Sequence, residues 1–102
     1  HITGGGLVEN LPRVMPNNTC ARINTKTWQR PAVFDWLQDR GNVDFIEMHR
    51  TFNCGIGMVL VLDPADQAQA IEILQRLGEQ VAVIGEIKST NQLEPFVELV
   101  SE

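Results

Sequence analysis

The residues with the clearest chemical potential stand at the start of the chain, where a threonine and three glycines, Thr3–Gly6, precede an apolar stretch. If a helix begins here, its first backbone N–H groups have no partner within the helix and lie at the positive end of the helix dipole. Such a helix start binds phosphate or carboxylate groups. On this pattern alone a flexible amino-terminal tail is the first interpretation, and an anion-binding site is the alternative.

A second glycine-bracketed stretch lies in the middle of the chain. Asn53, Cys54 and Gly55 break the pattern, and an almost continuous apolar run, Ile56–Leu62, follows. Runs of this kind are typical of strands buried on both faces, and a glycine inside one, here Gly57, often marks a close approach. We therefore expect a central strand around which the rest of the chain is organised.

No complete catalytic set can be assembled from the sequence. It contains no serine nucleophile elbow, no metal-binding pair of histidines and no full phosphate-binding loop. Cys20 and Cys54 lie far apart, and two scattered histidines give a zinc site little support. We expect free buried thiols in a reducing compartment, and no residue is assigned to catalysis or to a metal.

Composition and charge restrict the class of protein. A chain of 102 residues with 43% apolar and 21% charged residues is ordinary for one soluble domain, here residues 1–102. The net charge of -5 argues against a nucleic-acid or acidic-membrane partner, since both favour a basic face. No apolar run reaches the roughly 20 residues that span a bilayer, and no signal peptide is recognisable, so we expect a cytoplasmic protein.

Hydrophobic periodicity and capping residues place the remaining elements. Three strands and four helices are expected in addition to Ile56–Leu62, which predicts an α/β (α+β) fold with a mixed sheet and helices packed on one face. The strands are Thr19–Asn24, Val81–Lys88 and Phe96–Val100; the helices run from a Thr3 cap to Pro12, from Pro31 to Gly41, from Asp44 to Phe52 and from Asp63-Pro64 to Gly78.

Three side chains with functional potential are given ordinary structural roles. Trp28 and Trp36 are expected to anchor the core or an interface rather than to stack on a ligand. His49 is expected to be a solvent-facing residue near the end of its helix.

Two long motifs make the sequence recognisable. The segment His-Ile-Thr-Gly-Gly-Gly-Leu-x-Glu-Asn-Leu-Pro-Arg-Val spans residues 1–14, and Glu-Met-x-Arg-Thr-Phe-Asn-Cys-Gly-Ile-Gly-Met spans residues 47–58. Together with Ile84–Lys88, they resemble the later part of the C-terminal domain of phosphoribosylformylglycinamidine cyclo-ligase, the aminoimidazole ribonucleotide (AIR) synthetase of purine biosynthesis. The resemblance covers nearly the whole chain.

The resemblance implies a reaction and a partner domain. Members of this family use ATP and Mg²⁺ to activate the formamide oxygen of formylglycinamidine ribonucleotide, and an amidine nitrogen then closes the imidazole ring. The family's N-terminal domain makes the dimer and most of the ATP site. Because the chain lacks an initiator methionine, we expect a truncated C-terminal domain that binds no cofactor and is inactive alone, yet forms a homo-oligomer.

The resemblance also assigns candidate site residues. Those expected to face the substrate phosphate are His1, Thr3, Gly4, Gly5 and Gly6. Asn53 and Gly55 match the second motif and are expected either to support the site or only to form its turn.

Two other classes of function stay open at this stage. One is a stand-alone regulatory module with a ferredoxin-like arrangement that binds a phosphorylated metabolite. The other is a non-catalytic interaction domain whose glycines serve only turns.

Overall fold

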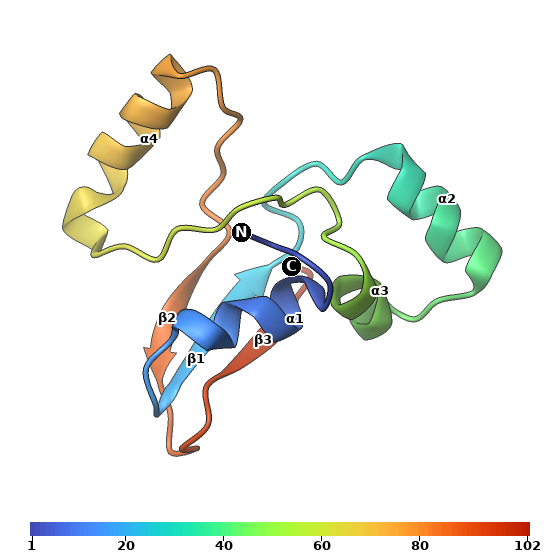
Figure 1. The fold of residues 1–102 in the computed structure, drawn as a ribbon, viewed down its shortest axis with the longest axis horizontal. Helices are drawn as coiled ribbons and strands as arrows, with labels where there is room; N and C mark the ends of the chain where they lie inside the picture. The colour runs from blue at the N-terminus through green and yellow to red at the C-terminus, as the bar shows by residue number, and fades with distance from the viewer.

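The computed structural model describes residues 1–102 and contains four α-helices, two short 3₁₀ segments and three strands (Figure 1). The elements in chain order are α1 (Gly6–Asn10), η1 (Leu11–Val14), β1 (Thr19–Asn24), α2 (Ala32–Gly41), α3 (Phe45–Thr51), η2 (Pro64–Asp66), α4 (Gln67–Arg76), β2 (Gly85–Ser89) and β3 (Phe96–Val100).

The sheet has the strand order β2-β1-β3 and is mixed. β1 pairs antiparallel with β2, where Ala21 lies opposite Ile87, and parallel with β3, where Ala21 lies opposite Val97. The central strand is therefore β1, whose residues Cys20, Ala21 and Ile23 are buried. The predicted fold class, a mixed sheet combined with helices, is confirmed.

The core is small and lies between the sheet and the amino-terminal segment. Ile2, Leu7, Leu11 and Met15 come from the segment that includes α1 and η1, and they pack with β1. Trp28 packs against this cluster, as expected of a core anchor. Only 11 of 102 residues are buried, so much of the apolar sequence lies outside the core.

Helix boundaries follow the capping residues in two places. The Asp44 side chain accepts a hydrogen bond of 3.0 Å from the backbone N–H of Glu47 at the start of α3, as its spacing predicts. The Asp63 side chain accepts one of 2.9 Å from Ala65, and Pro64 opens the 3₁₀ turn that leads into α4.

The predicted cap at Thr3 is wrong. α1 begins only at Gly6, its N-cap position is Gly5, and the Thr3 hydroxyl donates to the Asn10 side chain instead, at 2.9 Å. Gly5 and Gly6 both have positive φ, 101° and 59°, a conformation that favours glycine. The glycines therefore turn the chain into the helix, and this turn takes the place of a side-chain cap.

The predicted central strand, Ile56–Leu62, is also wrong, because this segment is extended but pairs with no strand. Ile56 and Val59 pack against the core, whereas Met58, Leu60 and other apolar side chains of the run are exposed. Nothing lies within 4 Å of the position of a Cβ on Gly57, so no neighbouring segment requires a glycine at this position. Of the predicted strand Val81–Lys88, only the second half pairs, as β2.

Helices α2 and α4 project away from the sheet on opposite sides (Figure 1), and neither has a buried residue. The helical cover of the sheet therefore comes from α1 and η1. Trp36 on α2 is exposed, with the Arg40 guanidinium 5.8 Å from its ring centroid, so it is not a core residue.

Candidate functional site

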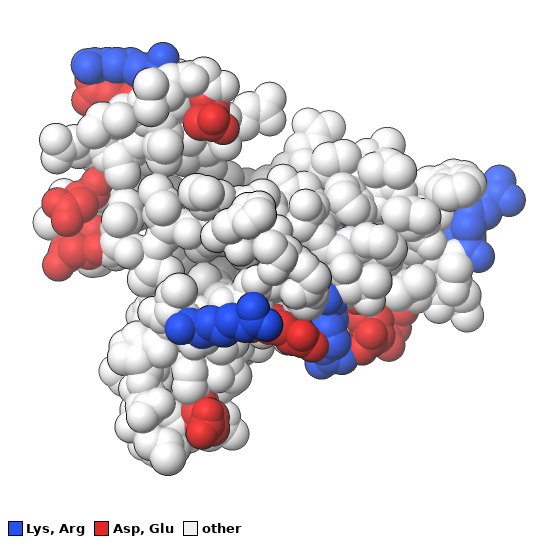
Figure 2. All heavy atoms as spheres, viewed as in Figure 1, with Lys and Arg blue, Asp and Glu red and all other residues white.

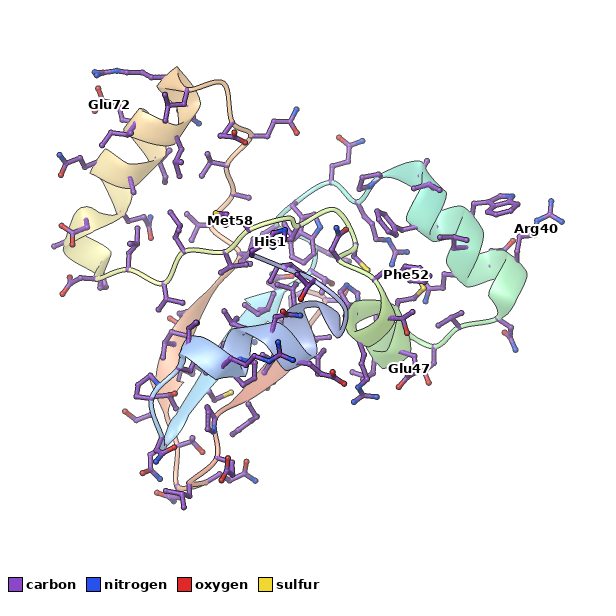
Figure 3. The ribbon with its side chains drawn as sticks, viewed as in Figure 1. His1, Arg40, Glu47, Phe52, Met58 and Glu72 are labelled. Carbon is purple, nitrogen blue, oxygen red and sulfur yellow. The ribbon has the colours of Figure 1, made fainter.

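The two motifs that stand far apart in the sequence are neighbours in the structure. The backbone N–H of Ile2 donates to the carbonyl of Gly57 at 2.8 Å. Figure 3 shows His1 and Met58 at this crossing, with Phe52 on the side toward α3. The Arg50 Nε lies 3.6 Å from a carboxylate oxygen of Glu9, which joins α3 to α1. The candidate site is therefore built from both motifs.

The amino-terminal stretch presents backbone donors that the chain itself does not use. The N–H groups of Thr3, Gly4 and Gly5 donate no hydrogen bond within the chain. The Asn10 side-chain amide donates to the carbonyls of Gly4 and Gly6, at 3.2 and 2.8 Å. Asn10 thus holds the loop by its carbonyl groups, and three consecutive N–H groups keep no partner within the chain.

The predicted phosphate-site residues differ in their accessibility. His1, Thr3 and Gly4 are exposed, Gly5 is half-buried and Gly6 is buried. A Cβ on Gly6 would overlap the carbonyl oxygen of His49. Gly6 therefore lets α1 approach the end of α3, while the other members of the set can face a ligand.

The charges beside this loop have mixed sign. A carboxylate oxygen of Glu9 lies 2.7 Å from the position that a Cβ on Gly5 would take, and it would repel a bound anion. Arg50 lies beside Glu9 and also pairs with Glu47, so its charge offsets part of this repulsion. Figure 2 shows blue and red side chains that alternate in a short row on this face of the molecule.

The second motif forms a tight turn. The Asn53 side chain accepts a hydrogen bond of 2.8 Å from the N–H of Gly55, and the Asn53 carbonyl accepts one of 3.0 Å from Ile56. Gly55 has φ 102°, and a Cβ there would lie 2.6 Å from the Pro31 ring. These hydrogen bonds of Asn53 stay within its own turn, and both residues have a structural reason for their type.

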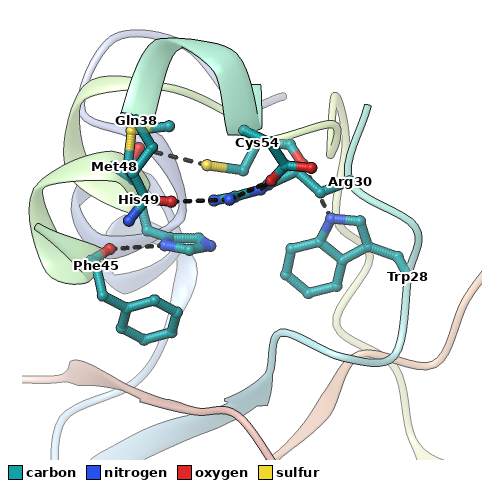
Figure 4. Close-up of polar contacts among 8 residues, drawn as sticks. Trp28, Arg30, Gln38, Phe45, Met48, His49 and Cys54 are labelled. Atoms are coloured by element: carbon teal, nitrogen blue, oxygen red, sulfur yellow. Dashed lines mark hydrogen bonds and ion pairs between the residues drawn. The ribbon is translucent and has the colours of Figure 1, made fainter. Parts of the chain in front are cut away.

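A polar cluster that includes Trp28, His49 and the Cys54 carbonyl lies beneath this turn, and no sequence pattern indicated it. The prediction that His49 faces solvent is wrong. His49 is only 2% exposed, and its Nδ1 lies 2.9 Å from the carbonyl of Phe45 (Figure 4). The Trp28 indole donates to the carbonyl of Cys54 at 3.0 Å. Spacing alone could not have found the cluster, because its members come from three separate segments.

The thiols have the environment that the sequence predicts. Cys20 and Cys54 are free and buried. Burial raises the pKa of both thiols, and the nearby Glu98 charge raises the pKa of Cys20 further. Both are therefore protonated and unreactive near neutral pH.

The side chains and helices of the chain bear on two further kinds of site, for metal ions and for membranes. No three His, Cys, Asp or Glu side chains come together in an arrangement that could hold a metal ion. None of the helices combines the length and the apolar character that crossing a membrane requires.

Comparison with known proteins decides the family. Residues 1–98 match the family described as AIR synthase related protein, C-terminal domain. The chain belongs to this family. A relative named phosphoribosylformylglycinamidine cyclo-ligase, from Chromobacterium violaceum, is 56% identical to this AIR synthase related domain over 88 residues. The resemblance inferred from the two motifs is confirmed.

The lengths of the two proteins differ greatly. The matched region covers 86% of the chain but only 26% of the Chromobacterium violaceum relative, so the AIR synthase related domain spans about a quarter of that protein. The structure therefore describes one part of the family's architecture.

Proposed function

We propose that this chain is the C-terminal part of a phosphoribosylformylglycinamidine cyclo-ligase, which converts formylglycinamidine ribonucleotide to aminoimidazole ribonucleotide with ATP. The observation that supports this proposal most strongly is the 56% identity to a relative of that name over most of the chain. The contact between the two motifs in space adds structural support, since residues 1–14 and 47–58 form one continuous region.

Within this enzyme, the amino-terminal loop contributes to binding of the substrate phosphate. Its free N–H groups at Thr3, Gly4 and Gly5 are donors of the type that phosphate oxygens accept. His1 and Gly6 flank them, His1 as an exposed residue and Gly6 as the packing point of the loop. Asn53 and Gly55 support the site through the turn that positions the second motif.

ATP, Mg²⁺ and the catalytic groups belong, on this proposal, to the N-terminal domain of the enzyme. The chain itself does not fit a magnesium site, because it gathers no group of three carboxylate, histidine or cysteine side chains. We assign this chain the role of holding the substrate phosphate, with cytoplasmic purine biosynthesis as its setting. The chain alone is expected to form no product.

A chimaera tests the proposal. In the Chromobacterium violaceum relative, the matching segment is replaced by the sequence of this chain, and ATP-dependent formation of aminoimidazole ribonucleotide is measured. We expect turnover within about tenfold of the unmodified relative. The relative supplies the rest of the enzyme, and this chain supplies the segment that it resembles. A folded chimaera that binds ATP but forms no product would contradict the proposal.

The phosphate role of the loop has its own test in the active chimaera. Gly5→Val is expected to raise KM for the ribonucleotide about tenfold, because a branched side chain at φ 101° distorts the loop and covers its N–H groups. KM is measured with saturating ATP, and Gly78→Val is the matched control, since Gly78 also has positive φ, 87°. A folded Gly5→Val chimaera with unchanged KM would contradict the phosphate-binding role of the loop.

The family match does not favour the stand-alone regulatory module. A non-catalytic interaction domain is likewise less well supported, because the N–H groups of Thr3, Gly4 and Gly5 remain available for a ligand.

A further inference from the structure

A second cavity lies apart from the amino-terminal loop, between the segment after β1, helix α2 and helix α3. Its volume is about 180 Å³. Residues that line it include Thr25, Lys26, Trp28, Gln38, Phe45 and His49. It is partly open to solvent, and Trp28 and Phe45 are the aromatic members of a mostly polar lining.

One polar atom of His49, a residue that lines this cavity, has no hydrogen-bond partner. The Nδ1 of His49 lies 2.9 Å from the Phe45 carbonyl and must donate to it, which leaves Nε2 as the acceptor of a neutral imidazole. Nε2 is buried and receives no hydrogen bond. Figure 4 shows it on the side of the ring that faces Trp28. A buried acceptor left unpaired is costly, and a ligand that donates to it removes that cost.

The protonation state of His49 is consistent with this role. Burial lowers the pKa of His49, and the nearby Arg30 charge lowers it further, whereas the hydrogen bond to Phe45 acts in the opposite direction. The imidazole is therefore neutral near pH 7 and keeps the Nε2 lone pair.

The walls combine aromatic rings with positive charge. The Phe45 ring centroid lies 4.9 Å and the Trp28 ring centroid 6.4 Å from that of His49. No Asp or Glu lines the cavity. Arg30 is engaged with Asp35 and Gln38, whereas the exposed Lys26 forms no ion pair and is free to meet an anion.

We propose that this cavity binds a small aromatic anion that carries a hydroxyl or N–H donor. The ring packs against Trp28 and Phe45, the donor bonds to His49 Nε2, and the anionic group lies near Lys26. The ring matches the aromatic walls, the donor matches the unpaired acceptor, and the anionic group matches the unpaired cation. The proposal does not depend on the cyclo-ligase function.

The first test uses the unaltered 102-residue chain and two probes. 4-Hydroxybenzoate carries the ring, the donor and the carboxylate, and benzoate lacks only the donor. Nitrogen-15 NMR of the His49 ring and the Trp28 indole follows each titration. We expect 4-hydroxybenzoate to shift the Nε2 signal and to bind about tenfold more tightly than benzoate. Equal affinities, or no shift at His49, would overturn the proposal.

Variants identify the residues. His49→Phe keeps a ring of similar size but removes the acceptor, and we expect it to abolish the preference for 4-hydroxybenzoate over benzoate. Lys26→Gln should weaken both probes about threefold, while Lys88→Gln, which changes a lysine outside the cavity, should leave both unchanged. If Lys26→Gln and Lys88→Gln act alike, the anion is not held at Lys26 and the proposal fails.

Discussion

Replacing Gly6 by alanine is expected to destabilise the chain by about 2–5 kcal/mol. Gly6 has φ 59°, where an L-residue costs about 1–2 kcal/mol, and its Cβ would overlap the His49 carbonyl oxygen and lie 2.7 Å from that of Phe52. Backbone atoms cannot rotate away, so α1 and α3 must separate, at a further cost of about 1–3 kcal/mol. The thermal midpoint, followed by circular dichroism, should fall by roughly 8 °C or more.

Gly78→Ala separates the two contributions to this loss. Gly78 also has positive φ, 87°, but nothing lies within 4 Å of its Cβ position. Its substitution carries only the conformational cost, which the reduced entropy of the unfolded chain partly offsets, and a net change within about 1 kcal/mol is expected. Equal losses at Gly6 and Gly78 would show that the close approach of α1 to α3 does not contribute to stability.

Local features of the fold could be predicted from sequence where a short-range interaction determines them. The Asp44 and Asp63 caps and the strands Thr19–Asn24 and Phe96–Val100 are confirmed. A cap depends on residues within one turn, and the strand patterns are read over a few residues. Caps and strand patterns can therefore be predicted without knowing which segments pack against them.

Features that depend on distant segments could not be predicted. An apolar pattern shows that Ile56–Leu62 is suited to burial but does not identify what buries it, and β1 takes the central position because β2 and β3 pair with both its edges. The prediction that His49 faces solvent is wrong for a related reason. Its burial results from Trp28 and Phe45 around it, and Trp28 belongs to another segment.

The loop Thr3–Gly6 is built differently from the helix start that the sequence predicts. The sequence indicated that Thr3–Gly6 offers backbone donors, and the structure leaves the N–H groups of Thr3, Gly4 and Gly5 unused. The sequence pattern predicts that these donors belong to a helix start capped by Thr3. In the structure α1 begins at Gly6, and the Asn10 side chain holds the loop. The role of Asn10 depends on where its side-chain amide lies relative to the carbonyls of Gly4 and Gly6. The residue type alone does not specify that position.

Many large apolar side chains lie on the outer surface of the chain. Its radius of gyration is 14.1 Å, whereas a compact domain of this length has about 13 Å. Large apolar side chains are exposed on the run after Gly57 and on α4, and Leu77 is 73% exposed. Figure 2 shows broad uncharged surface between the projecting helices. Apolar surface of this kind is typical of interfaces.

The isolated chain is therefore expected to self-associate. Burial of Met58, Leu60 and their apolar neighbours contributes about 25 cal/mol per Å², and the open edges of β2 and β3 offer unpaired backbone groups. The net charge of -5 opposes association, but salt screens it beyond roughly 8–10 Å. Sedimentation equilibrium at micromolar concentration should give at least twice the 11.4 kDa chain mass.

Matched charge variants locate the contact surface. Leu60→Glu places a carboxylate in the exposed apolar run and should shift the population to the 11.4 kDa monomer, because a charge buried without a partner is costly. Leu93→Glu makes the same change at a residue that is exposed in the turn between β2 and β3, and it should leave association unchanged. Because both variants alter net charge equally, a difference between them reports on the surface. A wild-type chain that sediments only as a monomer would contradict self-association, and equal behaviour of the two variants would place the contact elsewhere.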